Sequence, residues 1–318
     1  MDLRQLQALV AVAEHGTFSA AADALATVQS NVSAHVARLE RELGATLVDR
    51  SAGRLTEEGQ AVVDRARRIE AELEALVADV ASLRHDVTGR VRVGIIGTTA
   101  RWLVPRLLEV MGERHPNVAM EIVDATSTSL EPQLVNGRLD LAVVNLPLPA
   151  PELTTTPLFD EDLLLFVPVA SPLASAGRID ASRLAEVELF LPPRGTSMRD
   201  LLDDAARRAG VQLRARAELD GLRLIASLAI AGQGAAILPS TAVPGHLQGE
   251  TRPVAVRGLP RREVGVAQRK RGLPGAPARA FLEVLIELVA AEAARKPATG
   301  LHLPASTKPP RRPPPESS

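Results

Sequence analysis

Residues 17–59 read TFSAAADALATVQSNVSAHVARLERELGATLVDRSAGRLTEEG, and this stretch decides the fold of the N-terminal part of the chain. It predicts a short alanine-rich helix, a tight turn, a second helix and then a polar strand-turn-strand. Residues 3–14 add a third amphipathic helix before them. Apolar residues on the second helix of the stretch recur at spacings of four, three and four, which gives one buried stripe. That stripe is Val32, Val36, Leu39 and Leu43.

This order of elements is that of a winged helix-turn-helix, which places its second helix in the DNA major groove. The face of that helix opposite the apolar stripe presents mostly short polar side chains, which reach base edges without filling the groove. We therefore predict that this face and two wing arginines contact DNA, with the arginines holding phosphates. The predicted DNA-binding residues are Gln29, Ser30, Asn31, Ser33, Ala34, His35, Arg38, Arg50 and Arg54.

The stretch resembles the N-terminal domain of LysR-type transcriptional regulators. The matching elements include Gln29-x-x-Val32-Ser33, Leu43-Gly44, Leu47, Arg50 and the closing Leu55-Thr56-x-x-Gly59. The resemblance implies a sequence-specific, DNA-binding transcriptional regulator that is controlled by a small-molecule effector. It also implies a homodimer that pairs into a homotetramer, with double-stranded operator DNA as partner and RNA polymerase as a further candidate partner.

Three positions depart from the family pattern. Val28 stands where members often carry a serine, which weakens the cap of the recognition helix. Val48 replaces the usual phenylalanine of the wing and thins its packing. Ala34 occupies a position that is often arginine, which removes one base contact. The departures leave the family assignment in place, but they make the operator sequence unpredictable.

Composition limits the classes of protein to which the chain can belong. At 318 residues it is long enough for two or three domains, and its net charge of −1 gives no overall attraction to nucleic acid. Residues 1–60 carry eight acidic and five basic side chains, so DNA binding must come from a few placed arginines, doubled by dimerisation. The chain has no cysteine, which excludes disulfides and thiolate metal sites. Without a bilayer-length apolar run or a signal peptide, we expect a cytoplasmic protein.

From residue 57 to about residue 84 the sequence contains no proline, and its apolar residues alternate at spacings of four and three. This heptad pattern, with charged flanks, predicts a linker helix that pairs with a second copy. A long surface helix docked on its own core is the alternative. The predicted dimerisation seam is Val62, Ile69, Leu73, Leu76, Val80 and Leu83.

After Gly89 strands and helices alternate, which predicts an α/β fold with parallel sheets. The resemblance implies an effector domain of two α/β lobes, similar to periplasmic binding proteins, with the chain crossing between the lobes twice. We expect a winged helix-turn-helix domain at 1–59, the linker helix at 60–88 and the effector domain at 89–294. Its first lobe covers about 89–162 and 266–294, and its second lobe about 163–265. Residues 295–318 are rich in proline and predict a disordered tail, with a ligand for proline-motif domains as the alternative.

Ligands of open α/β sheets bind at the carboxyl ends of the strands. Thr98 and Thr99 lie between the first strand and its helix, where hydroxyls and free N–H groups predict an anion site; plain helix capping is the alternative. Arg194 occupies the corresponding turn of the second lobe, as a carboxylate or phosphate partner or as a solvated side chain. Further positions resemble positions that contact ligands in some relatives. Together with them, the predicted effector-binding residues are Thr98, Thr99, Ser127, Asn145, Arg194 and Thr196.

Motifs for catalysis are missing from the sequence. It has no G-x-S-x-G elbow, no P-loop and no dinucleotide-binding glycine pattern, and its histidines lack metal-ligand spacing. We therefore expect no enzyme activity, no cofactor and no metal. Two alternatives belong to other classes: a cytosolic small-molecule receptor, and an enzyme with an appended DNA-binding domain.

Overall fold

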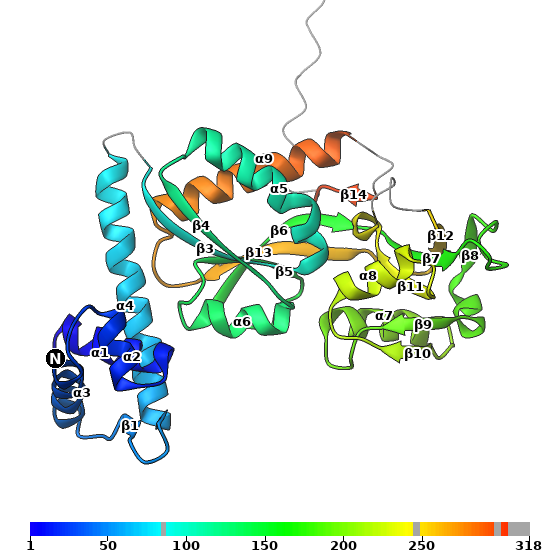
Figure 1. The fold of residues 1–318 in the computed structure, drawn as a ribbon. Helices are drawn as coiled ribbons and strands as arrows, with labels where there is room; N and C mark the ends of the chain where they lie inside the picture. Colours follow the sequence, from blue (N-terminus) through cyan, green and yellow to red (C-terminus); the bar gives the residue numbers. More distant parts are fainter. Residues whose placement is uncertain (84–86, 244–248, 296–299, 305–318) are drawn as a thin grey trace, which may run out of the picture. The chain divides into compact units, whose positions relative to one another are not determined.

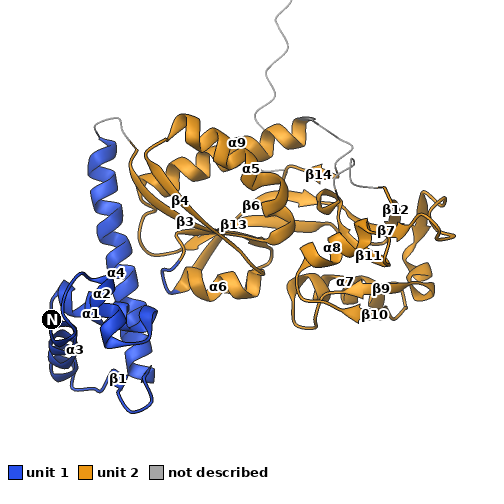
Figure 2. Cartoon of the chain, viewed as in Figure 1, with its two compact units in different colours: residues 1–84, 136–138 blue, residues 85–135, 139–318 orange. Residues whose placement is uncertain are grey.

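A computed structural model describes residues 1–83, 87–243, 249–295 and 300–304 of the chain. They fall into two compact units (Figure 2): residues 1–84 with 136–138, and residues 85–135 with 139–318. Within the described ranges, no helix is both long enough and apolar enough to cross a membrane.

The first unit begins with three helices, α1 (Leu3–His15), α2 (Phe18–Ala24) and α3 (Gln29–Leu43) (Figure 1). Their apolar stripes meet in one core, in which Leu9, Val36 and Leu39 are completely buried. The turn between α2 and α3 contains Ala26 at φ 50°, the left-handed region that a residue with a side chain seldom adopts. This tight turn sets α3 against α2, as the sequence predicts for a helix-turn-helix.

A short two-stranded wing, β1 (Val48–Asp49) and β2 (Arg54–Leu55), leads into the long helix α4 (Glu57–Ser82). Thr56 caps α4 by accepting a hydrogen bond from the Gly59 N–H at 2.9 Å, and its hydroxyl donates to the Thr46 carbonyl at 2.7 Å. Gly59 packs directly on the backbone of Leu47, where a Cβ atom would overlap the carbonyl group. The motif Leu55-Thr56-x-x-Gly59 therefore joins the wing to α4 through one helix cap and one backbone contact.

The first lobe of the second unit is a six-stranded sheet in the order β14-β6-β13-β5-β3-β4. Strands β3, β4 and β5 are parallel, whereas β13 runs antiparallel to both of its neighbours. Helices α5 (Gly97–Arg114) and α9 (Ala276–Arg295) lie side by side near the sheet, and α6 (Ser127–Val135) lies apart from them (Figure 1). The strands are β3 (Gly89–Ile95), β4 (Val118–Asp124), β5 (Leu141–Asn145), β6 (Leu153–Glu161), β13 (Arg262–Arg269) and β14 (Leu301–His302).

The second lobe is a six-stranded sheet in the order β10-β9-β11-β7-β12-β8, and it carries two separate buried apolar clusters. Its helices are α7 (Ser197–Arg208) and α8 (Leu222–Ile230), with the 3-10 turns η1 (Ala181–Glu186) and η2 (Ser240–Ala242). Its strands are β7 (Leu163–Pro168), β8 (Arg178–Asp180), β9 (Glu188–Leu191), β10 (Arg214–Glu218), β11 (Ala235–Pro239) and β12 (Thr251–Arg257).

The chain crosses between the lobes twice, and one crossing differs from its predicted position. The first lies at Asp162, between β6 and β7, beside the predicted boundary between residues 162 and 163. The return crossing precedes Arg262, because all of β13 pairs with β5 and β6 in the first lobe. The predicted boundary at 265/266 is therefore wrong by a few residues. Strands β6 and β8 also have no counterpart in the prediction.

The tail prediction is wrong at one point. Strand β14 falls inside the segment expected to be disordered, and Leu301 is buried in the first-lobe core. The strand exists because Leu301 pairs with Glu161 of β6 and so extends the sheet. The rest of the predicted tail, at 296–299 and beyond 304, and the end of the predicted linker at 84–86, lie outside the described residues.

Candidate functional site

The predicted DNA-contacting surface lies on α3 and the wing. Most of its side chains are exposed, while Ser33 and His35 are half-buried. Arg50 donates a hydrogen bond to the Ser33 hydroxyl at 3.3 Å, and its guanidinium lies 5.2 Å from the ring centre of Phe18. These contacts hold the first wing arginine beside the recognition helix.

Two carboxylates shape the wing. Glu40, on α3, accepts hydrogen bonds from the N–H groups of Leu47 and Val48, at 2.8 and 3.2 Å, which fixes the start of the wing to the helix. Asp49 organises the wing turn, and the hydrogen bond from the Ser51 hydroxyl lowers the pKa of its carboxyl group. These hydrogen bonds therefore fix the position of the wing relative to the recognition helix.

The N-terminus of α3 has no side-chain cap. Val28 is its N-cap residue and makes no such hydrogen bond, as the sequence predicts. The first N–H groups of α3 are thus left without a side-chain acceptor, at the positive end of the helix dipole. A DNA phosphate is a suitable acceptor for these groups.

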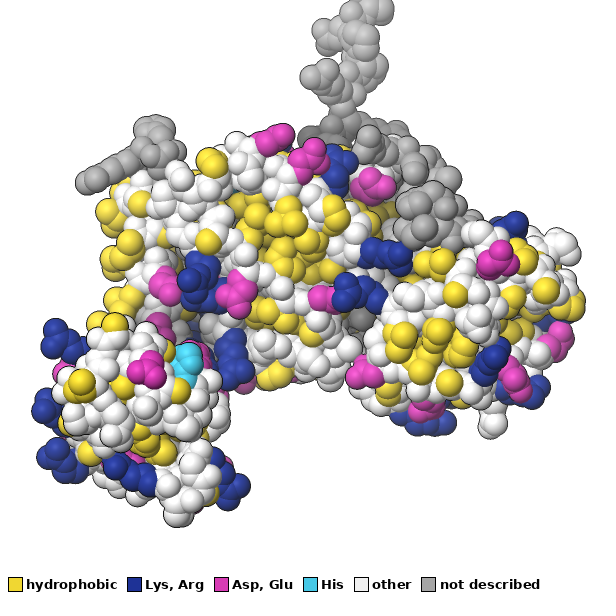
Figure 3. Space-filling view, viewed as in Figure 1, with side chains coloured by type: hydrophobic (Ala, Val, Ile, Leu, Met, Phe, Trp, Pro, Cys, Tyr) yellow, Lys and Arg dark blue, Asp and Glu magenta, His cyan; other side chains and the backbone are white. Residues whose placement is uncertain are grey.

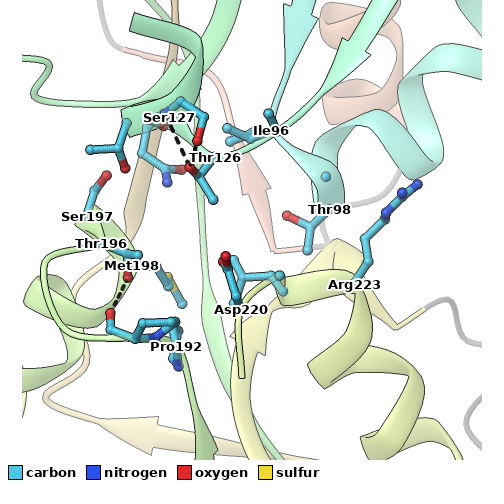
Figure 4. Close-up of a pocket in the computed structure, with 18 of the residues that line it drawn as sticks. Ile96, Thr98, Thr126, Ser127, Pro192, Thr196, Ser197, Met198, Asp220 and Arg223 are labelled. Carbon is cyan, nitrogen blue, oxygen red and sulfur yellow. Dashed lines mark hydrogen bonds between the residues drawn. The ribbon is translucent and has the colours of Figure 1, made fainter. Parts of the chain in front are cut away.

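A cavity of about 370 Å³ lies between the two lobes of the second unit (Figure 4). It is built from turns that follow strand ends, at residues 96–98, 124–129 and 145 in the first lobe and at residues 192–198, except 194 and 195, and 220–223 in the second. Arg262, the first residue of β13, completes the wall. The N-termini of α5, α6, α7 and α8 all contribute residues to this space, as expected for ligand sites in α/β sheets.

Arg262 is the buried charge of the cavity wall, with 1% of its side chain exposed. Its Nη2 donates to Glu161 Oε2 at 2.5 Å and to the Thr99 hydroxyl at 3.4 Å, and its Nη1 donates to the Thr98 hydroxyl at 2.9 Å. Glu161 is completely buried, and its other oxygen accepts from the Thr241 N–H at 2.8 Å. The two charges therefore neutralise each other inside a network that reaches both lobes.

A second ion pair crosses the cavity closer to solvent. Arg223, at the start of α8, contacts the Asp124 carboxylate at the end of β4 at 2.5 Å, and its side chain is 58% exposed. Asp220 also lines the cavity and is exposed. Figure 4 shows Thr98 and Arg223 on one side of the space and Thr196, Ser197 and Met198 on another. Both arginines of the wall thus have acidic partners within the chain.

The cavity brings together four of the six predicted effector residues, Thr98, Ser127, Asn145 and Thr196. Thr99 does not line it, because its hydroxyl is completely buried against Arg262. Arg194 does not line it either. Three hydroxyls already make internal hydrogen bonds: Thr98 accepts from Arg262, Ser127 accepts from the Asn145 N–H at 3.0 Å, and Thr196 caps α7.

The residues predicted from the sequence do not include the four charged residues of the wall, Asp124, Asp220, Arg223 and Arg262. The sequence predicts strands at 119–124 and 215–219 and a helix at 222–231, so the strand-end rule could have found Asp124, Asp220 and Arg223. Arg262 gives no local signal, because its place depends on where the chain returns to the first lobe. Arg199 supports the wall from behind: it donates to the Pro192 carbonyl at 2.9 Å and to Glu218 at 2.7 Å, and that hydrogen bond lowers the pKa of Glu218.

The predicted dimerisation seam divides into two parts on α4. Val62 packs against the core of the first unit. Farther along the helix the seam is exposed, with 61% of Leu76 and 54% of Val80 open to solvent, and Figure 3 shows hydrophobic side chains along this part of α4. The exposed seam is Ile69, Leu73, Leu76, Val80 and Leu83.

Comparisons with known proteins match both units. The family model "Bacterial regulatory helix-turn-helix protein, lysR family" matches residues 3–60, and "LysR substrate binding domain" matches residues 84–290. A Mycobacterium leprae protein described as "Probable hydrogen peroxide-inducible genes activator" is 33% identical over 297 residues, which are 90% of this chain and 94% of that protein.

Two solved structures are similar over nearly the whole chain. Full-length OxyR from Pseudomonas aeruginosa, in a variant with aspartate in place of one cysteine, has a TM-score of 0.71 at 27% identity, covering 90% of this chain and 94% of its own. Full-length CbnR complexed with its target DNA has a TM-score of 0.66 at 25% identity, covering 92% of this chain and 100% of its own.

Proposed function

The chain belongs to the LysR family of DNA-binding transcriptional regulators with an effector-binding domain, and from this premise we propose that a small molecule held reversibly between its lobes controls its action on DNA. The observation that carries the proposal is the cavity, which takes its wall from strand ends of both lobes. A ligand in contact with both lobes favours one of their arrangements by its differential affinity, typically worth about 1–3 kcal/mol.

The signal enters this chain without thiol chemistry. The matched Mycobacterium leprae protein is named for peroxide induction, and the matched Pseudomonas aeruginosa structure carries a substitution at a cysteine. The present chain contains no cysteine, so thiol oxidation and disulfide formation have no substrate in it. Reversible occupancy of the cavity is the route that its own residues support.

The chemistry of the wall supports a small polar effector. Hydroxyl groups come from both lobes, including Ser129 and Ser197, while Arg223 and Arg262 are each paired with a carboxylate of the chain. A ligand would therefore be held mainly by hydrogen bonds to hydroxyls and N–H groups. An acidic ligand would have to compete with Asp124 for Arg223.

On the DNA side, the exposed residues of α3 read the bases and the wing arginines hold phosphates. The exposed seam of α4 supports a homodimer that places two recognition helices on one operator, and two such dimers form a tetramer. Changing the lobe arrangement then changes the distance between the recognition pairs and the bend of the DNA between them. RNA polymerase is a candidate partner of the DNA-bound tetramer.

Replacing Leu76 by Asp tests the dimer. A carboxylate in the seam should lower the oligomeric state, because burying a charge among apolar side chains costs several kcal/mol. The sedimentation coefficient and the affinity for the operator should then both decrease. Glu72→Asp, one turn away on the same helix, is the matched control. Unchanged sedimentation of the Leu76→Asp protein would refute the seam.

The effector proposal is tested in two steps on the full chain. The operator is mapped by footprinting, and metabolites are screened for those that both raise the melting temperature and alter the footprint. Ser129→Ala and Ser197→Ala, in opposite lobes, should each weaken the active ligand roughly 2- to 10-fold, the value of one lost hydrogen bond. Ser175→Ala, an exposed serine away from the cavity, is the control. Equal responses of all three variants would show that the ligand binds elsewhere.

An enzyme with an appended DNA-binding domain makes a different prediction in the same experiment. A ligand that alters the footprint would be consumed during incubation. Its recovery unchanged, measured by mass spectrometry, supports the regulator.

A further inference from the structure

We propose that the buried Glu161–Arg262 pair and the docked segment 300–302 act together as a hinge clamp that sets the angle between the two lobes. Glu161 and Arg262 lie on β6 and β13, the strands at which the chain leaves and re-enters the first lobe, and segment 300–302 pairs with the end of β6. The inference rests on the proposed function only for its consequence, that an effector changes the angle. The clamp itself consists only of residues of the chain and needs no effector.

The ion pair joins the lobes from within. Arg262 opens β13 and donates to Thr98 and Thr99 on α5 of the first lobe, while Glu161 accepts from the Thr241 N–H on η2 of the second. The pair is sealed from solvent, with 1% and 0% of the two side chains exposed. A rotation of the lobes must therefore carry the whole network or leave a buried charge short of a hydrogen bond, which is costly.

The segment 300–302 joins the lobes from the outside of the crossing. Leu301 pairs with Glu161 and is buried in the first-lobe core, and the Asp162 N–H donates to the Gly300 carbonyl at 2.8 Å. Gly300 has φ 68°, and a Cβ atom there would lie 2.9 Å from the Ser240 hydroxyl and 3.0 Å from Asp162 Cβ. The segment thus fits closely against both lobes at the point where the first crossing begins.

Charges beside the segment add to the same junction. Asp162, the residue between β6 and β7, contacts Arg261 Nε at 2.8 Å and His302 Nε2 at 3.2 Å. Arg261 immediately precedes Arg262, so both crossings meet the C-terminal strand at one carboxylate. Figure 1 shows β14 beside the end of β6, next to the second lobe.

The clamp also reaches the ligand site. Arg262 and Thr98 line the cavity and are hydrogen-bonded to each other. A ligand that engages the Thr98 hydroxyl competes with Arg262 for it. Ligand binding in the cavity would therefore directly change the hydrogen bonds of the hinge clamp.

The experiment uses the absence of native cysteine, which lets two introduced cysteines carry spin labels without background. Glu109→Cys on α5 and Arg207→Cys on α7 place one label on each lobe, at side chains that are 62% and 76% exposed. Pulsed electron resonance then measures the distance between the labels in the full, ligand-free chain. We compare the labelled parent with Gly300→Ala and with Glu161→Gln.

We expect both variants to shift the distance or to broaden its distribution roughly twofold, because the lobes then sample more than one angle. Gly210→Ala is the matched control: it has the same backbone conformation, φ 71°, but a Cβ atom there meets nothing within 4 Å, so the distribution should stay that of the parent. Circular dichroism shows which variants are folded. If one of the two variants is unfolded, the distance distribution of the other tests the clamp.

A parental distribution in folded Gly300→Ala and Glu161→Gln proteins would overturn the clamp. Because neither DNA nor ligand is present, that result would leave the effector proposal standing. Conversely, a cavity that binds no metabolite would leave the measured clamp intact.

Discussion

The predicted DNA-contacting surface and the cavity are assembled in opposite ways. The surface comes from one continuous stretch, residues 29–54, and its side chains are mostly exposed. The cavity draws its wall from six separate segments between residues 96 and 262. Local sequence pattern can therefore place the first site, whereas the second exists only after both lobes and both crossings have formed.

The two regions also treat their arginines differently. Arg54 on the wing is exposed and is proposed to contact a DNA phosphate, whereas Arg262 in the cavity wall is buried and paired with Glu161. A charge that serves binding can remain in water, because water stabilises it until the partner arrives. A charge that serves architecture is buried, and its partner must come from the same chain.

The largest effect should come from breaking the buried pair. Arg262→Met leaves Glu161 buried without its partner and should lower the free energy of unfolding of the C-terminal unit by about 3–5 kcal/mol. Chemical denaturation measures this loss. Replacing both residues, with Arg262→Met and Glu161→Leu, should restore part of it, because no uncompensated charge remains.

Arg223→Met is the matched control for that prediction. Its pair with Asp124 also crosses the cavity, but 58% of the Arg223 side chain is exposed, so the cost should be at most about 1 kcal/mol. Equal losses for Arg223→Met and Arg262→Met would break the distinction between an architectural and a solvated pair.

The next prediction concerns the N-terminal unit, whose contacts join residues that lie close together in the sequence. Gly59→Ala should destabilise the N-terminal unit by about 3 kcal/mol, because its Cβ would overlap the Leu47 carbonyl and force the wing away from α4. Gly112→Ala, also inside a helix but with nothing within 4 Å, should instead stabilise α5 by about 0.5–1 kcal/mol. Thermal denaturation of both variants measures the difference, and changes of the same sign would contradict the contact.

The two regions also differ in how far their sequence predicts them. The helix-turn-helix was predictable because its apolar spacing, its turn and its Thr56–Gly59 close all lie within a few residues of one another. Fold and family are confirmed. In the cavity, Thr98 and Thr196 were placed by a rule about strand ends, which needs only the positions of the strands, and Ser127 and Asn145 by strand ends together with the resemblance to relatives.

What the sequence did not reveal depends on non-local pairing. Strand β6 contains polar threonines and Pro157, which hide it among loop residues, and β14 is two residues long within a proline-rich segment. Each becomes a strand because the neighbouring strand supplies its hydrogen bonds. Arg262 was missed for the same reason, since its partners Thr98 and Glu161 lie 164 and 101 residues away along the chain.

The smallest expected effects separate two kinds of DNA contact. Gln29→Ala should change the preference for one base by about 1–3 kcal/mol, because an exposed side chain at the start of the recognition helix would contact a base edge. Arg54→Ala should weaken all sequences alike, because a phosphate contact positions the protein without reading the base. Binding to a set of single-base operator variants measures both. An equal loss of affinity for every operator variant in Gln29→Ala would show that Gln29 does not contact a base.

One footprinting experiment tests most directly the claim that the signal enters through the cavity and not through a thiol. The full chain is bound to its operator, and the footprint is recorded alone, with hydrogen peroxide, and with the ligand identified by the metabolite screen. We predict that treatment with peroxide, followed by its removal, leaves the footprint unchanged, because the chain has no cysteine to oxidise, and that the ligand shifts it in the parent and less in Ser197→Ala. A footprint that moves with peroxide and ignores every cavity ligand would contradict the account.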